Sequence, residues 1–329
     1  MSEASGHPAA AKDRKGSSAG PKWSAGGDAR AAEGASGGAG GTQDADDVDF
    51  ARAKAATVEQ ALRGGAVVCR VADAAAFDVA PEGFRPGDLL PNAKRVVVVG
   101  GAAPRAGDWA SPLHEHQETM GTSDRINSLG LKIAKFIEDQ FGYYGLFVPP
   151  GVNKGNRPFL SVALAAELSG CGTASLAGPI LHPEHGLLYY SAIVTTLPFP
   201  VDGPLSEPVC PAPSCVEMWR ERGTTPCLDV CPIQNGGCLG GEIVEGRFAN
   251  RQYDAARCTS RVYTHWIPGF QKALEAALSE TDQEKRKMIL YSSFFTRTLW
   301  SITYSAQSQA QCYECMRVCP VGAEKRALK

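Results

Sequence analysis

The sequence predicts an α/β (α+β) protein, in which a layered α/β domain is followed by a cysteine-rich module. Two observations predict this fold class. Apolar patterns typical of helices and of strands alternate between residues 49 and 204, which favours helices layered on a sheet. Nine of the eleven cysteines then follow between Cys210 and Pro320. We therefore divide the chain into a tail (1–48), an α/β cofactor-binding domain (49–204) and a cysteine-rich domain with a helical insertion (205–329).

The tail, residues 1–48, is rich in Gly, Ala and Ser. It has too little apolar surface to offset its ordering entropy, so we expect disorder. It also lacks an apolar signal core and a paired-arginine signal, and no apolar run reaches the roughly 18 to 20 residues of a membrane span. With a net charge of −2, nothing in the composition favours nucleic acid or membranes. We expect a cytoplasmic protein.

Periodicity predicts the elements of the α/β domain. Helices are expected over 49–63, from a cap at Ser123 onwards, and over 159–168, because apolar residues recur there at helical spacing. Strands are expected over 66–71, 94–101 and 187–196. The second contains the run Val96–Val99, which is typical of a strand buried on both faces. Residues 266–300 are expected to be largely helical and form the insertion.

The cysteine spacing is the most specific feature of the chain. Cys227-x3-Cys231-Pro232 and Cys315-x3-Cys319-Pro320 both end in the C-x3-C-P pattern of bacterial ferredoxins. In that pattern the cysteine before proline binds the other cluster. Two such endings therefore predict two [4Fe–4S] clusters that share ligands across the module.

Eight thiolates are needed for two cubane clusters, and the crossover rule divides them into two sets. The first cluster would be bound by Cys210, Cys215, Cys227 and Cys319, and the second by Cys231, Cys258, Cys312 and Cys315. Cys238 is a ninth cysteine, which could replace Cys210 or Cys258. Disulfides require an oxidising compartment, and structural zinc does not explain two C-x3-C-P endings.

Motifs upstream and downstream of the clusters resemble one known family. They are Gly170-Cys171-Gly172, Pro183-Glu184-His185-Gly186, Thr195-Thr196-Leu197-Pro198, the segment 88–99 with its Val run, and Ala256-Arg257-Cys258-Thr259-Ser260. In this order they resemble the epoxyqueuosine reductases and reductive dehalogenases, over roughly residues 50 to 322. The resemblance supports Cys258 as a ligand.

This resemblance implies a nitroreductase-like α/β domain joined to a ferredoxin-like double-cluster module. It implies an iron–sulfur oxidoreductase in which a reduced ferredoxin or flavodoxin-type donor passes electrons through the clusters to a base-off cobalamin, which then acts on a small-molecule substrate. The alternatives are a flavin in the same pocket, or an electron-transfer protein or subunit with no second cofactor. The oligomeric state is left open.

Candidate site residues of the α/β domain follow from the same resemblance. The acidic proton donor of epoxyqueuosine reductases has no counterpart here, whereas reductive dehalogenases use a tyrosine. Tyr143-Tyr144 and Tyr189-Tyr190 are available for this role, and we take Tyr143 and Tyr144 as the candidates. The family's lysine or arginine after the glycine pair, and the Asp of its Thr-Asp-Leu-Pro motif, are also absent. The small residues of segment 170–178 let the backbone approach a large flat ligand. The expected cofactor-binding residues are Gly170, Gly172, Ser175, Gly178 and His185.

Overall fold

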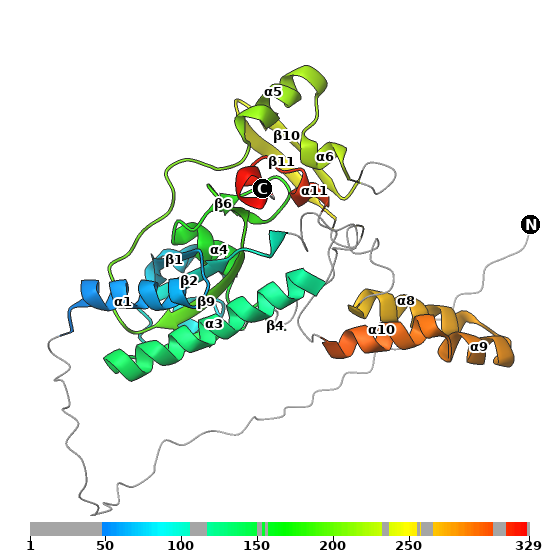
Figure 1. Ribbon diagram of the computed structural model, residues 1–329, viewed down its shortest axis with the longest axis horizontal. Helices are drawn as coiled ribbons and strands as arrows, with labels where there is room; N and C mark the ends of the chain where they lie inside the picture. The colour runs from blue at the N-terminus through cyan, green and yellow to red at the C-terminus, as the bar shows by residue number, and fades with distance from the viewer. Residues whose placement is uncertain are drawn as a thin grey trace, which may run out of the picture. The chain divides into compact units, whose positions relative to one another are not determined.

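A four-stranded antiparallel sheet organises the α/β region of the computed structural model (Figure 1). Its strand order is β1 (Val68–Asp73), β2 (Arg95–Gly101), β9 (Tyr189–Thr195) and β3 (Gly145–Val148). The register pairs Val97 with Ile193 and Val71 with Val97. The structure describes residues 48–105, 117–149, 153–154, 157–231, 237–254, 257, 266–304 and 314–327.

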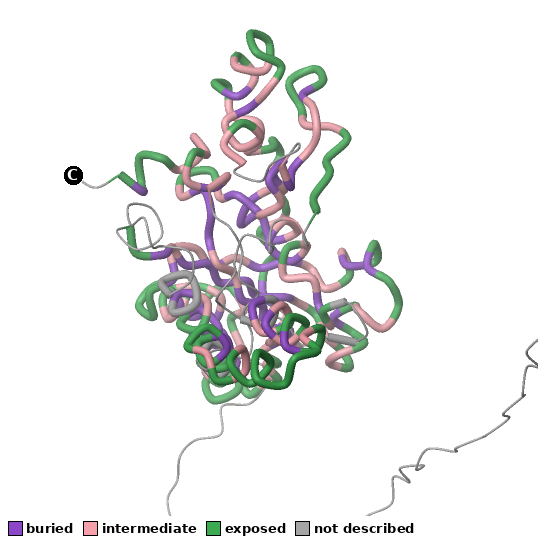
Figure 2. Tube along the Cα trace, turned by 90° about the vertical axis from the view of Figure 1, so that its right-hand side faces the viewer, coloured by how far each residue is buried: buried purple, intermediate pink, exposed green. Residues whose placement is uncertain are grey.

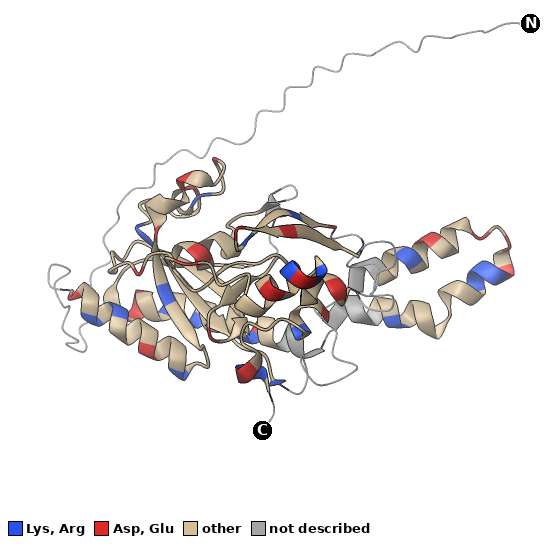
Figure 3. Cartoon of the chain, turned by 90° about the horizontal axis from the view of Figure 1, so that it is seen from above, with Lys and Arg blue, Asp and Glu red and all other residues tan. Residues whose placement is uncertain are grey.

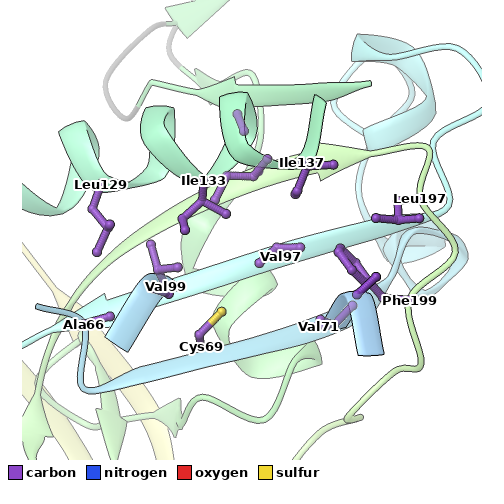
Figure 4. Packing of buried hydrophobic residues seen from close by; sticks show 14 of the residues in the cluster. Ala66, Cys69, Val71, Val97, Val99, Leu129, Ile133, Ile137, Leu197 and Phe199 are labelled. Atoms are coloured by element: carbon purple, nitrogen blue, oxygen red, sulfur yellow. The ribbon is translucent and has the colours of Figure 1, made fainter. Parts of the chain in front are cut away.

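Helices cover both faces of this sheet. One face carries Val97, Val99 and Ile193 and packs against α1 (Phe50–Arg63) and α3 (Gln117–Phe141). Figure 4 shows Leu129, Ile133 and Ile137 of α3 lying over the strand that holds Val97 and Val99. The other face packs against α4 (Val162–Leu168). The predicted fold class, helices layered on a sheet, is confirmed.

The Val run is buried on both faces, as predicted. Val96 to Val99 are each at most 1% exposed, because alternate side chains enter the two apolar layers. Burying one such side chain contributes roughly 1.5–3 kcal/mol to the free energy of unfolding. Figure 2 shows buried stretches in the interior of the described part of the trace and exposed stretches on its outside.

Several predicted boundaries differ from the structure. The first helix is confirmed, with the Asp49 carboxylate accepting hydrogen bonds from the N–H groups of residues 51 and 52. The prediction that Ser123 caps the second helix is wrong, because α3 begins at Gln117 and Ser123 lies within it. The third begins later than predicted, after the Ser161 cap. β1 lies two residues further along than the predicted 66–71, and β9 is shorter than 187–196.

Short elements connect the layers of the α/β region. They are η2 (Ala74–Val79), α2 (Pro86–Leu89), the pair β4 (Asn153–Lys154) and β5 (Arg157–Pro158), and a small sheet of β6 (Thr173–Ala174), β7 (Ile180–His182) and β8 (Gly186–Leu187). The β6–β7–β8 sheet is antiparallel and lies between α4 and β9 in the sequence. It brings residues 173–187 towards the cysteines described below.

The cysteine region is built from short helices and one hairpin. The helices are α5 (Pro213–Arg222), α6 (Pro226–Asp229), α11 (Glu314–Arg317) and α12 (Ala323–Arg326), and the hairpin pairs β10 (Leu239–Val244) with β11 (Arg247–Tyr253). α11 packs against α6, although the sequence separates them widely. This contact brings the two cysteine blocks together.

The predicted helical insertion is confirmed as three helices, α8 (Trp266–Ser279), α9 (Gln283–Leu290) and α10 (Ser293–Tyr304). α8 and α10 pack on each other, with the rings of Phe270 and Phe295 5.8 Å apart between centroids. None of the helices in the described part of the chain is long and apolar enough to cross a membrane. Acidic and basic residues are interspersed along the described parts of the chain (Figure 3).

The described residues, all from residue 48 onwards, belong to one compact unit. The division at residue 204 stays a prediction, as does disorder of the tail, because residues 1–47 lie outside the described residues.

Candidate metal centre

Four cysteines from separate parts of the sequence line one small cavity. Cys210 precedes α5, Cys215 lies in the first turn of α5, Cys227 lies in α6, and Cys319 follows α11. These are the four residues that the crossover rule assigns to the first cluster. Apolar side chains, including Leu181 and Met316, complete the lining. The chain therefore places Cys319 with the first cysteine block.

Polar groups near the four sulfurs favour their ionised form. The Leu176 N–H donates to the Cys210 sulfur (N to Sγ 3.5 Å), and nearby backbone amides lower the pKa of Cys215, Cys227 and Cys319 against the larger effect of burial. The hydroxyl of Thr225, which is 1% exposed, lies 3.2 Å from the Cys227 sulfur. Such donors stabilise negative charge on sulfur, and they are one of the protein's means of setting the potential of an iron–sulfur cluster.

Burial makes these thiols hard to ionise while they are unbound. It raises the pKa of Cys210 to about 12 and that of Cys215 to about 11, and it also raises the pKa of Cys227 and of Cys319. Repulsion between neighbouring thiolates adds to the effect at Cys210 and Cys215. A cationic group bound among them would reverse this balance and release the protons.

Four thiols of one cavity are the donor set that a cubane cluster requires, because its four irons are bound by four Cys thiolates. Among the described residues, no three His, Cys, Asp or Glu side chains gather closely enough to hold one metal ion. The residues present therefore match a cluster in kind and number.

A second group of cysteines lies in the same apolar cluster of side chains. It contains Cys231, Cys238 and Cys315, together with Cys210, Cys227 and Cys319 of the first group. The sulfurs of Cys231 and Cys238 are 3.6 Å apart, and the Cys238 N–H donates to the Cys231 sulfur at 3.3 Å. Cys258 and Cys312, the other predicted ligands, lie outside the described residues. Of the two alternatives for Cys238, the structure places it beside Cys231 rather than at the Cys210 position.

The predicted cofactor segment 170–178 is packed mainly against its own chain. A Cβ atom on Gly170 would lie 2.4 Å from the carbonyl oxygen of Gly203, and one on Gly172 would lie 2.4 Å from that of Leu181. Ser175 is buried, and its hydroxyl donates to the Pro179 carbonyl (2.7 Å). Gly178, with a φ of +113°, has open space where a Cβ would be. The described residues of this segment therefore show no cradle for a flat macrocycle, although the segment does border the four-cysteine cavity.

The predicted tyrosines lie elsewhere. Tyr143 packs in the α1–α3 layer with its ring against that of Phe50, and Tyr144 is exposed. Both precede β3, which pairs with the Thr195 end of β9. Tyr190 is at the other end of β9 and donates to the Cys171 carbonyl, and burial raises its pKa. The structure thus does not bring Tyr143 or Tyr144 together with segment 170–178.

His185 lies in the turn between β7 and β8, beside the cysteine region. Its ring centroid is 5.1 Å from that of His182, whose Nδ1 accepts hydrogen bonds from the N–H groups of Glu184 and His185. The turn touches the loop after Cys319, since a Cβ on Gly322 would lie 2.3 Å from the His185 carbonyl carbon. Of the predicted non-cysteine residues, Ser175 lines the four-cysteine cavity, and the turn that holds His185 touches the loop after Cys319.

Sequence reasoning missed two groups at this centre, Thr225 and Arg326. Thr225 directly precedes the Pro226-Cys227 pair, so a hydroxyl two residues before a ligand was the available signal. Arg326 donates hydrogen bonds to the Cys319 and Val321 carbonyls. Arg326 follows the last C-x3-C-P ending at a spacing that belongs to no recognised motif, so the sequence held no signal for it.

Comparisons with solved structures return the two classes that the motifs resemble. An epoxyqueuosine reductase bound to a modified tRNA-Tyr stem loop is 19% identical, with a TM-score of 0.47, over 84% of this chain and 67% of that one. The enzyme from Bacillus subtilis is 18% identical, with a TM-score of 0.45, over 83% and 66%. A catabolic reductive dehalogenase in complex with 3-bromo-4-hydroxybenzoic acid is 16% identical, with a TM-score of 0.47, over 83% and 38%.

No family model matches the chain, and no characterised protein matches it by sequence. The chain spans about two thirds of the length of the epoxyqueuosine reductases and less than two fifths of the dehalogenases. The tRNA stem loop in one neighbour differs from our expectation that nucleic acid is not a partner. At this level of similarity, function has to be inferred from the residues of the site.

Proposed function

We propose that this chain is an iron–sulfur oxidoreductase with two [4Fe–4S] clusters. The first is held by Cys210, Cys215, Cys227 and Cys319. The second is held by Cys231 and Cys315 with two of the remaining cysteines, Cys238, Cys258 and Cys312. One observation carries the proposal, namely that four thiols from both cysteine blocks line a single cavity. When bound, the clusters supply one-electron transfer.

The protein's own residues bind and shield the first cluster. The N–H group of Leu176 donates to the Cys210 sulfur, and the Thr225 hydroxyl lies 3.2 Å from the Cys227 sulfur, two contacts that would stabilise the negative charge of a bound cluster. Leu181 and Met316, both at most 2% exposed, keep water from the cavity. Exclusion of water strengthens each of these electrostatic contacts.

Electrons enter from a donor and leave to an acceptor, and both are part of the proposal. The donor is a reduced ferredoxin or flavodoxin-type protein, and the final acceptor is a small molecule. The order of motifs favours a base-off cobalamin as the intermediate carrier, with a flavin or no further cofactor as alternatives. Because the spaces beside Gly170 and Gly172 are filled by the chain itself, we assign no step to a corrinoid.

The cluster proposal is tested by metal analysis of anaerobically reconstituted protein. Wild-type protein should contain about eight iron and eight acid-labile sulfide per chain. Cys319→Ser and Cys231→Ser should each lose about half of both, whereas Cys69→Ser, at a cysteine outside the metal centre, should lose none. Stoichiometric zinc without broad absorption near 400 nm would contradict the proposal.

The second cofactor is tested separately on cluster-loaded protein. Titration with hydroxocobalamin should give a base-off spectrum and a cobalt EPR signal without nitrogen superhyperfine splitting. Tight binding of flavin instead, or of neither compound, would select one of the alternatives. A tRNA stem loop in the same binding assay tests the expectation that nucleic acid is not a partner.

A further inference from the structure

Arg326, the last residue of α12, is a charged side chain buried beside the metal centre. It is 9% exposed. Its Nη1 donates to the Val321 carbonyl at 2.6 Å, and its Nη2 makes a short hydrogen bond to the Cys319 carbonyl. Removing a guanidinium from water costs free energy unless hydrogen bonds and opposite charge compensate it. The two carbonyls supply hydrogen bonds but no net charge.

A bound cluster would provide that charge, because its cysteine ligands are thiolates. The guanidinium donates to the carbonyl of the ligand residue Cys319 itself and to that of Val321 in the same loop. The positive charge of Arg326 therefore lies beside a proposed ligand of the first cluster.

Close packing holds the guanidinium in place. Gly186 of β8 leaves room for it, since a Cβ there would lie 2.7 Å from Nη1 and 2.4 Å from the Val321 carbonyl oxygen. Gly322 has a φ of +73°, which glycine adopts readily. The loop 319–322 is thus enclosed between the β7–β8 turn and the Arg326 side chain. A side chain constrained in this way cannot swing out to solvent without opening the loop.

We propose that Arg326 positions Cys319 and sets the reduction potential of the first cluster. This inference rests on the proposed function. Reduction adds one negative charge to the cluster, and a buried cation nearby stabilises that charge more strongly than it would in water. Local charge and hydrogen bonding to the sulfurs are established determinants of cluster potentials. Arg326 does not bind the cluster itself; it acts by holding the ligand residue Cys319 in position.

Two substitutions separate the charge from the hydrogen bonds. Arg326→Gln removes the charge and keeps an amide donor, and Arg326→Lys keeps the charge but loses the two-pronged donor geometry. Lys325→Gln is the matched control, because it removes one positive charge from an exposed neighbour in the same helix, where solvent screens it. The measurements are iron and sulfide content and an EPR-monitored redox titration of full-length, two-cluster protein, with the second cluster as an internal reference.

Arg326→Gln should keep its iron and shift the midpoint of the first cluster to more negative potential. We expect at least a tenfold change in the reduced-to-oxidised ratio at fixed potential, which is about 59 mV for a one-electron couple. Arg326→Lys should remain closer to wild type, and Lys325→Gln should not shift. An unshifted first cluster in iron-replete Arg326→Gln would overturn the inference.

If Arg326→Gln loses iron, the lysine variant still tests the role of the charge. In that case Arg326→Lys should restore the cluster at near wild-type potential, and failure of lysine to restore it would overturn the role of the charge. Absence of iron from wild-type protein would instead refute the proposed function, so the two failures are distinguishable.

Discussion

At the scale of single residues, the environment of each cysteine decides its chemistry. Cys69 and Cys171 are buried in the two apolar layers of the sheet, and burial raises the pKa of each to about 12. At pH 8 roughly one such thiol in ten thousand is ionised, against about one in ten for a thiol with a pKa of 9. Since the thiolate is the reactive form, these two cysteines are structural.

Both buried thiols should therefore resist alkylation. In folded protein at pH 8, iodoacetamide should leave Cys69 and Cys171 unmodified over times that label an unfolded control completely. Peptide mass spectrometry gives the extent at each site. Rapid modification of either residue in the folded state would show that the layer around it opens readily.

The neighbouring sulfurs of Cys231 and Cys238 lead to a second residue-scale prediction. Because Cys238 is buried beside Cys231 and Cys315, we expect it to supply a ligand to the second cluster in place of Cys258. The sulfurs of Cys231 and Cys238 are 3.6 Å apart, which is the separation of two thiols in contact. As ligands of one cluster, the two residues would each bind a different iron. Cys238→Ser should lose about four irons per chain, whereas Cys258→Ser should keep eight. The opposite result would restore the crossover assignment with Cys258.

At the scale of elements, the β7–β8 turn depends on a neutral histidine. His182 Nδ1 accepts from two backbone N–H groups, and burial, assisted by His185, lowers the pKa of His182. As the pH falls, His182 therefore takes up its proton at a higher pH in the unfolded chain than in the folded chain. Stability from this group is therefore complete above about pH 6.5 and decreases as the pH falls below it.

This turn yields a pH prediction. The melting temperature of wild-type protein should fall between pH 7.5 and pH 5.5, and His182→Asn, which keeps an oxygen acceptor without a titrating ring, should show a smaller fall. Burial lowers the pKa of His185 as well, so His185→Asn should also reduce the fall, but it leaves the two backbone bonds to His182 Nδ1 in place at neutral pH. Equal acid sensitivity of wild type and His182→Asn would mean that other groups cause the loss.

Elements with one dominant local signal could be predicted from the sequence, and others could not. The Val run predicted β2 because burial on both faces leaves a continuous apolar stretch. The β10–β11 hairpin was missed, since most of β11 is exposed and no apolar alternation marks it. Its turn has positive φ at Glu245 and Gly246, as two-residue hairpins require. Glu245 replaces the Asn or Asp that would have signalled it.

At the scale of the whole molecule, the spacing predicts which cysteines meet, but it says nothing of the surroundings of the cavity. The C-x3-C-P endings predict that Cys319 meets Cys227, and the two residues line one cavity; the clusters that they bind stay a prediction. The donors from Leu176 and Arg326 depend on how the β6–β8 sheet and α12 pack around the cysteines. Such long-range contacts leave no periodic trace in a single sequence.

Under the proposed function, the same crossover would make cluster binding a determinant of the stability of the whole molecule. The first cluster would join residues 210–227 to Cys319 and so close the long intervening loop in the folded state. A group that binds only the folded chain stabilises it by mass action. Burial raises the pKa values of the cysteine thiols, and the described residues that line the cavity offer them no other cation of comparable charge. The stabilisation requires Cys319.

Removal of the clusters from wild-type protein by anaerobic chelation should therefore lower the melting temperature by several degrees, since about 1 kcal/mol corresponds to roughly 2–4 °C in a domain of this size. Cys319→Ser should melt below loaded wild type before chelation and lose less on chelation, because it retains only the second cluster. Cys69→Ser controls for removal of a thiol outside the metal centre. Differential scanning calorimetry under anaerobic conditions measures all three. If wild type and Cys319→Ser lost equal stability on chelation, the first cluster would not link the two cysteine blocks.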